Sequence, residues 1–135
     1  MTRENRLSAF MESIASEDMI WGVNDCTQVA RRWVEAETGR QIDGINYQSR
    51  LEAYKHIKER GGLDTIWREQ LSVAGFYQTQ YPEYGDIGIC DTGRSDIGMI
   101  GVIVLHGGAV AWRSINGWRM FSPRGMTTYW TVPKS

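Results

Sequence analysis

Asp25 and Cys26 have the residue types and the spacing for nucleophilic chemistry, because they stand directly before an amphipathic segment. In residues 27–36 the apolar side chains recur at helical spacing, which predicts a helix with Asn24 or Asp25 as its N-cap. Cys26 would then lie in the first turn, where free backbone N–H groups and the positive end of the helix dipole stabilise a thiolate. The Asp25 carboxylate opposes this effect by raising the pKa of a neighbouring thiol, so the sequence leaves the reactivity of Cys26 open.

Two interpretations of Cys26 follow from these residues. It is either a nucleophile, whose own N–H could bind a developing oxyanion, or a small buried hydrophobe behind a capped helix. Trp21 and Gly22 are likewise typical of a tight turn beneath an aromatic side chain. The residue types alone do not separate the two roles.

The segment from Trp21 to Cys26 resembles the nucleophile region of the NlpC-type cell-wall peptidases, which belong to a papain-like superfamily. It resembles more closely a family of small phage and prophage proteins that carry the pattern Trp-Gly-x-x-Asp-Cys before a helix ending in Thr-Gly. The resemblance covers most of the chain. The further matches are Thr38-Gly39, Tyr47-Gln48-Ser49, Gly61-Gly62 and Gly85-Asp86.

The resemblance implies one papain-like, NlpC-type α+β domain over residues 1–135, with N-terminal helices packed on a small antiparallel C-terminal sheet. In the peptidases the strand after the Gly-Asp turn carries the catalytic His. In this chain Met99 stands at that position, and Asp96 stands there in a second register. The third polar residue falls near Ala111 or Trp112. The nucleophile is therefore present without its usual base, and the closer phage relatives also tend to lack this His.

The composition fits one globular domain, because 135 residues with 41% hydrophobic residues and six Trp are enough for one core. The chain has no apolar run of about eighteen residues and no signal-peptide core, so we expect no membrane span and synthesis in the cytoplasm. Cys26 and Cys90 are too few for a disulfide framework, and we expect them to stay unbridged. No zinc spacing and no phosphate-binding glycine pattern occurs, so we expect neither a metal nor a cofactor.

The charge is unevenly distributed along the chain. The net charge is −1, but residues 1–96 carry −5 and the remaining residues carry +4. The four basic residues of this C-terminal part are Arg113, Arg119, Arg124 and Lys134. They could face an anionic surface, or they are solvated arginines and a lysine on the outer face of strands. No nucleic-acid-binding motif accompanies them, so we expect no nucleic-acid partner.

The expected elements place helices before strands. We expect helices at residues 4–18, 26–37, 49–60 and 63–74. We expect strands at residues 87–89, 97–105, 109–112, 118–121 and 128–132. This order predicts an α+β domain with an antiparallel meander, in which 97–105 is a central strand buried on both faces.

Neither histidine is expected to replace the missing base. His56 lies on the charged helix 49–60, where a histidine is usually at the surface. His106 lies at a Gly-Gly hairpin turn, and the strand residues between it and Met99 separate the two by roughly 23 Å at about 3.3 Å per residue. Asp96 would be a poor base for a thiol, because the pKa of a carboxylate lies far below neutral pH.

These observations favour a structural or assembly component of a phage or prophage tail, with other tail proteins as partners and a degenerate catalytic site. The alternative is an active cysteine peptidase or amidase, in which Cys26 attacks cell-wall peptides during phage entry. A third hypothesis, a DNA-contacting accessory protein, rests only on the basic C-terminal part.

We expect Trp21 to cover the start of the Cys26 helix whether or not Cys26 reacts. Trp21→Ala should then lower the free energy of unfolding by about 3–5 kcal/mol, the usual effect of removing a large buried aromatic side chain. Thermal unfolding measures this loss. A melting temperature equal to that of the wild type would show that the motif has no structural role.

Overall fold

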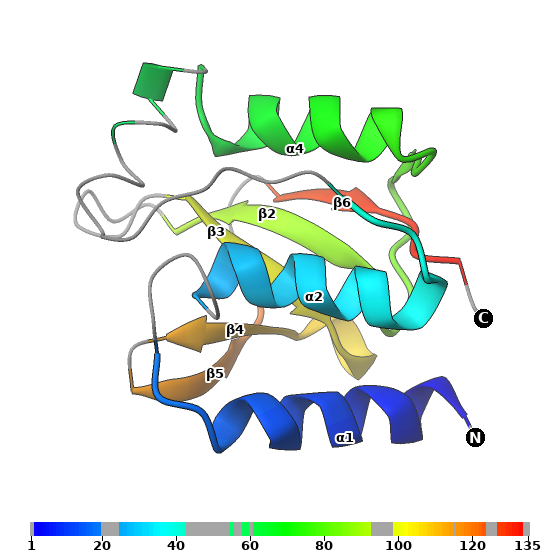
Figure 1. The fold of residues 1–135 in the computed structure, drawn as a ribbon, viewed down its shortest axis with the longest axis vertical. Coiled ribbons are helices and arrows are strands. Elements are labelled where there is room, and N and C mark those ends of the chain that lie inside the picture. The colour runs from blue at the N-terminus through cyan, green and yellow to red at the C-terminus, as the bar shows by residue number, and fades with distance from the viewer. Residues whose placement is uncertain are drawn as a thin grey trace.

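The computed structural model describes residues 2–19, 25–42, 55, 58–59, 61–92, 99–114, 116–123 and 127–133. Within these residues three α-helices pack on an open, six-stranded antiparallel sheet (Figure 1). The helices are α1 (Arg3–Ala15), α2 (Cys26–Thr38) and α4 (Leu63–Val73). The strands are β1 (Gln78–Thr79), β2 (Ile87–Asp91), β3 (Met99–Val104), β4 (Val110–Ser114), β5 (Gly117–Phe121) and β6 (Thr127–Trp130). The expected α+β class is confirmed.

Local signals in the sequence set both ends of α2. The N-cap is Asp25, whose side chain accepts a hydrogen bond from the N–H of Gln28 at 3.4 Å. The C-cap is Gly39 in the left-handed conformation, with a φ of 71°, which glycine adopts without strain. The helix therefore begins and ends where the sequence predicts.

Two other helix predictions have different outcomes. Helix α1 ends at Ala15, before the expected end at residue 18. The expected helix 49–60 lies largely outside the described residues; Lys55, Lys58 and Glu59 are described and are helical. No helix among the described residues is long and apolar enough to cross a membrane.

The strands do not follow one another across the sheet as the expected meander requires. Their order is β1-β6-β2-β3-β4-β5, so β2 to β5 form the meander and β6 returns to pair with both β2 and β1. Trp130 at the end of β6 is buried and packs against Trp67 of α4, with 5.8 Å between ring centroids. Burial of this large aromatic side chain near α4 favours the return of β6.

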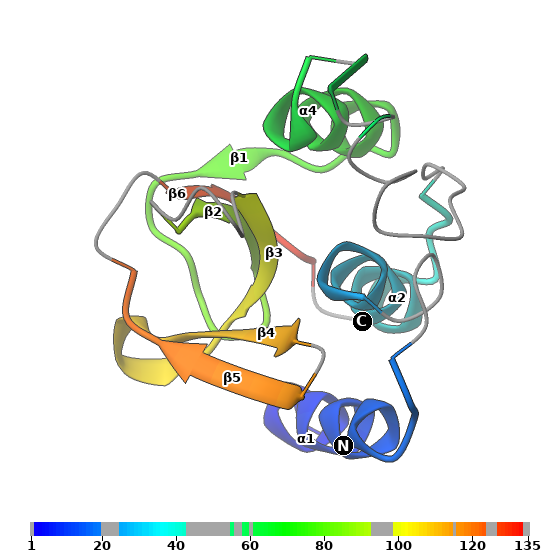
Figure 2. The same cartoon turned by 90° about the vertical axis from the view of Figure 1, so that its left-hand side faces the viewer.

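Strand β3 is the centre of the sheet and the place where the sheet bends. In Figure 2 it curves between β2 and β6 on one side and β4 and β5 on the other, with α2 beside it. Its residues from Ile100 to Val104 are all buried, which confirms the expected central strand. Pairing with β4 is confined to Ile103↔Ala111 and Val104↔Val110, so the two strands diverge toward the other end of β3.

Two apolar clusters lie on opposite faces of the central strands. The larger cluster joins the three helices to β2, β3 and β6, and Trp33, Trp67 and Trp130 are its aromatic members. The smaller cluster consists of Cys90, Ile100, Val102, Val104 and Val110. Because side chains alternate along a strand, β3 supplies Ile103 to the larger cluster and its neighbours to the smaller one.

A buried ion cluster fastens the start of α1 to the end of α2. The Glu37 carboxylate is fully buried and accepts hydrogen bonds from Arg3 Nε at 2.6 Å and from Arg6 Nε at 2.6 Å. Arg3 also donates to the carbonyl oxygen of Val132 at 2.7 Å, and its guanidinium lies 3.9 Å from the Asp86 carboxylate. One arginine therefore connects both helices to the turn before β2 and to the chain after β6.

Gly85 makes room for this arginine. A Cβ atom at Gly85 would lie 2.6 Å from Cδ of Arg3, and the residue has a φ of 89°. Its carbonyl oxygen accepts a hydrogen bond from the indole N–H of Trp33 in α2 at 2.8 Å. The Gly85-Asp86 pair therefore precedes β2 and also contacts α1 through Arg3 and α2 through Trp33.

Burial opposes ionisation of Glu37, but the hydrogen bonds and charges of Arg6 and Arg3 outweigh it and hold the pKa of this carboxyl below its ordinary value. A carboxyl whose pKa is lower in the folded state stabilises the fold fully above its unfolded pKa of about 4.3. This contribution is lost as the pH falls through the folded pKa. Glu37 therefore contributes its stability at neutral pH.

We predict that Glu37→Gln lowers the free energy of unfolding by about 3–5 kcal/mol at pH 7, because it removes the buried carboxylate that pairs with both Arg3 and Arg6. The difference from the wild type should shrink as the pH falls below about 4, because the unfolded wild-type chain then takes up a proton on Glu37 before the folded chain does. Denaturant unfolding across this pH range measures both effects. Glu12→Gln, at an exposed position of α1, is the control and should change little. A loss for Glu37→Gln that is equal at pH 3 and pH 7 would contradict the ionic role.

Candidate functional site

Cys26 is the first residue of α2, as the sequence predicts, and it is partly buried. The preceding Asp25 is 1% exposed and caps the helix. The Cys26 sulfur lies 4.0 Å from the hydroxyl oxygen of Thr27. The thiol, the buried carboxylate and the backbone N–H groups of the first turn therefore lie close together.

The first turn of α2 lies directly against β3, and Gly101 permits this close approach. A Cβ atom at Gly101 would lie 3.1 Å from the carbonyl oxygen of Cys26 and 3.0 Å from the ring of Trp67. Both distances are shorter than ordinary contacts, so a larger residue would push the helix or the indole ring away. Glycine at this position fixes the distance between the cysteine and the central strand.

The Cys26 thiol is poorly suited to ionise in this setting. Burial and the charge of Asp25 raise its pKa to about 11, and the Gly101 and Thr27 contacts that favour the thiolate only partly offset them. The helix terminus therefore does not produce a reactive thiolate here. The sequence leaves open whether Asp25 or the helix terminus has the larger effect on the thiol pKa. In the structure burial and Asp25 have the larger effect, so the thiol stays protonated.

Met99 lies at the position where the resemblance expects the catalytic His. It is the first residue of β3 and stands two residues before Gly101, so the two positions share a face of the strand. The Met99 residue is partly exposed, at 39%. The thioether can neither accept a proton from the thiol at neutral pH nor return one to a leaving group. Asp96, the second candidate, lies outside the described residues, as do His56 and Trp21.

The other residues near the expected third position are apolar or aromatic. Ala111 is fully buried, and Trp112 on the opposite face of β4 offers only an indole N–H. His106 lies in the short 3-10 helix that follows β3, at the end of the strand away from Met99. This placement agrees with the expectation that His106 lies too far from Met99 to replace the missing base.

Arg113 is a polar residue whose burial the sequence analysis missed. The sequence predicts either a basic surface position or a solvated position on a strand, but Arg113 is 4% exposed on β4. Its Nη2 donates to the carbonyl oxygen of Glu17 at 2.8 Å and its Nη1 donates to that of Ser114. The sequence carries no local signal for this burial, because the contact with Glu17 joins residues far apart in the chain. Arg113 therefore adds no charge to the molecular surface.

The two cysteines are both free, so the prediction that they are unbridged is confirmed. Cys90 is buried on β2 and belongs to the smaller apolar cluster. Among the described residues, no group of three or more His, Cys, Asp or Glu side chains could hold a metal ion.

We predict that alkylation of native Cys26 by iodoacetamide follows a pKa of about 11 and is slow at pH 7.5. Asp25→Asn should shift the midpoint to lower pH, because it removes a negative charge while asparagine still caps the helix. Asp64→Asn, in the first turn of α4, is the matched control and should leave the midpoint unchanged. Mass spectrometry of the Cys26 peptide measures the rates. A native midpoint near 9, or one that Asp25→Asn leaves in place, would show that burial and Asp25 do not control the thiol.

No curated protein and no solved structure matches this chain. A family model does match it, over residues 1–132, and its description is a domain of unknown function, DUF6950. Because the match covers nearly all of the sequence, the chain belongs to the DUF6950 family.

Proposed function

We propose that this chain is a non-catalytic papain-like domain of the NlpC type that serves as a structural component of a phage or prophage tail. The observation that carries the non-catalytic part is the state of Cys26, whose pKa of about 11 leaves about one thiol in 10,000 ionised at pH 7. The tail assignment is supported by the resemblance of the Trp-Gly-x-x-Asp-Cys segment to small phage proteins.

Among the described residues, those around Cys26 do not supply the groups that peptide hydrolysis needs. A cysteine hydrolase must take up the thiol proton, protonate the leaving amine and activate a water molecule. Met99 at the base position can do none of these, and general acid–base catalysis alone contributes about 100- to 10,000-fold in rate. Asp25 is the carboxylate next to Cys26 in the chain, and its charge raises the thiol pKa instead of lowering it.

The arrangement of elements is compatible with a papain-like domain. The helix that carries the cysteine begins against the central strand of an antiparallel sheet, and Gly85-Asp86 opens the strand before it (Figure 1). These features support the proposed fold family. The proposed domain keeps the position of an active site, but its described residues include no proton-transfer group for Cys26.

Assembly requires exposed surface that another chain can cover, and β5 offers it. This strand is an edge of the sheet, and edge strands present unpaired backbone groups to a partner. Met120 is 61% exposed and Arg119 is exposed beside it. Met and Arg are residue types enriched in protein interfaces, so β5 is a plausible contact in a tail.

We predict that the purified wild-type protein does not cleave cell-wall peptide fragments. Met99→His should produce measurable hydrolysis, because it places an imidazole on the strand face that Cys26 contacts through Gly101. Met99→Gln is the matched control, since it has similar size and cannot act as a base. Mass spectrometry of fragments after incubation detects cleavage.

Cleavage by the wild type that Cys26→Ala abolishes would instead establish an active cysteine peptidase or amidase. The tail assignment has a separate test, which is to purify particles from a producing host and to search their tails for this chain by mass spectrometry. Complete particles that do not contain the chain would contradict a structural role.

A further inference from the structure

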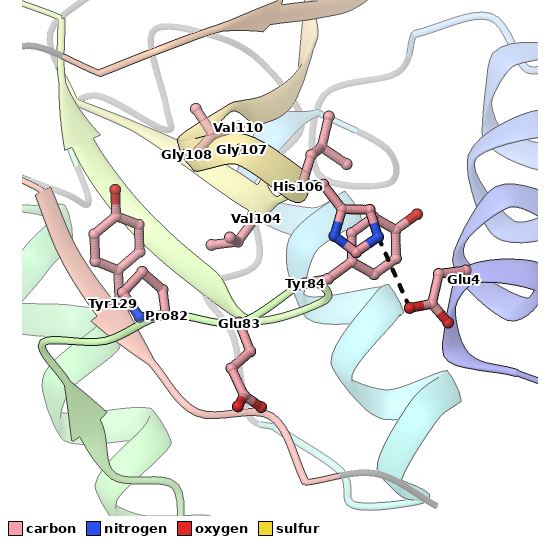
Figure 3. Close-up of a pocket in the computed structure, with 11 residues that line it drawn as sticks. Glu4, Pro82, Glu83, Tyr84, Val104, His106, Gly107, Gly108, Val110 and Tyr129 are labelled. Carbon is pink, nitrogen blue, oxygen red and sulfur yellow. Dashed lines mark ion pairs between the residues drawn. The ribbon is translucent and has the colours of Figure 1, made fainter.

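A hollow of about 430 Å³ lies at the end of β3 away from Met99 (Figure 3). Segments distant in the sequence line it: the start of α1, the connection from β1 to β2, the β3–β4 turn and β6. It uses none of the residues around Cys26. Its role is therefore separate from the proposed state of the thiol.

The floor and the walls of this hollow differ in chemistry. Val104 and Val110, which pair across β3 and β4, are buried and form an apolar floor. Tyr129 stands on one side of them, and Tyr84 with His106 stands on the other (Figure 3). The rings of Tyr84 and His106 are stacked, with centroids 4.2 Å apart and planes inclined by 20°. A ligand part in this hollow would therefore meet aliphatic carbon below and flat aromatic rings beside it.

The charges of the hollow have one sign. Among the described residues its lining contains no Lys or Arg, and the two carboxylates of that lining belong to Glu4 and Glu83. Glu4 lies beside the stacked rings, with its Oε1 3.8 Å from His106 Nε2, whereas the Glu83 side chain points away from Val104 (Figure 3). The Glu4 and His106 side chains are 55% and 70% exposed, so both remain open to a ligand. Glu4 is thus the acceptor that a cationic group would find next to the aromatic wall.

We infer that this hollow binds an arginine side chain presented by an extended segment of a partner polypeptide. The aliphatic stem of arginine covers the valine floor, and its planar guanidinium stacks against an aromatic ring while it pairs with Glu4. Lysine fits less well, because its compact ammonium is strongly hydrated and does not stack. An anionic side chain in the same place is disfavoured by the carboxylate of Glu4.

The open rim permits a chain to cross the hollow. Gly107 and Gly108 have φ values of 71° and 78°, and a Cβ atom at either position would meet nothing within 4 Å. Both residues are exposed at the edge of the hollow. An extended peptide could lie along this edge and direct one side chain inward.

The test is titration of the full chain, followed by NMR, with the peptide acetyl-Gly-Arg-Gly-amide. The citrulline peptide has nearly the same shape without the charge, and the lysine peptide has the charge without the planar group. We expect saturable shifts of the Gly107 and Gly108 amides and the His106 ring with the arginine peptide. We expect binding about tenfold or more weaker with citrulline, and weaker binding with lysine.

Glu4→Gln should weaken binding of the arginine peptide about two- to fivefold, as expected for loss of a partly exposed ion pair, and Glu12→Gln on the same helix should not. Thermal melts of both variants verify that the fold is retained. The inference is overturned by any of three results: no saturable shift at these residues, equal binding of citrulline or lysine, or an affinity that Glu4→Gln leaves unchanged. None of these readouts depends on Cys26, so failure here leaves the proposed function standing.

Discussion

The buried carboxylate of Glu37 is the interaction on which the placement of the helices depends. It binds Arg3 and Arg6 at the start of α1. Arg3 also donates a hydrogen bond to the carbonyl oxygen of Val132, which follows β6. Because Glu37 lies near the end of α2, these bonds fix one end of the cysteine helix, and the contact over Gly101 fixes the other. The ionic cluster thus anchors the C-terminal end of α2, and close packing over Gly101 positions its N-terminal end. These two attachments help to set the position of Cys26 against β3.

The competition at Cys26 shows why a helix N-terminus alone does not create a nucleophile. A helix terminus stabilises a charge by about 0.3–1 kcal/mol at ordinary surface sites. A tenfold change in the thiolate equilibrium corresponds to about 1.4 kcal/mol, so the helix alone changes a thiol pKa only modestly. Burial against β3 and the charge of Asp25 act in the opposite direction and outweigh it. Asp25 caps the helix well, and the same carboxylate suppresses ionisation of the next residue.

Much of this could be predicted from sequence because the signals are local. Asp25 and Gly39 cap α2, alternation and length identify β3, and the Gly-Gly pair marks the turn after it. The return of β6 and the burial of Arg113 could not be predicted, because both depend on partners distant in sequence. The hollow near His106 was missed for the same reason. Glu4, Tyr84 and His106 carry no shared motif, and only the fold brings them together.

Strand β3 separates the two groups that a cysteine hydrolase would need to combine. Its first half meets the cysteine helix at Gly101, and His106 follows its last residue. A strand is rigid and extended, so no rotamer change or small helix shift brings that imidazole to the thiol. His106 is instead committed to the stack with Tyr84 and to the neighbourhood of Glu4. The fold thus keeps the Cys26 thiol protonated at one end of β3. It places His106 at the other end, beside Tyr84 and Glu4.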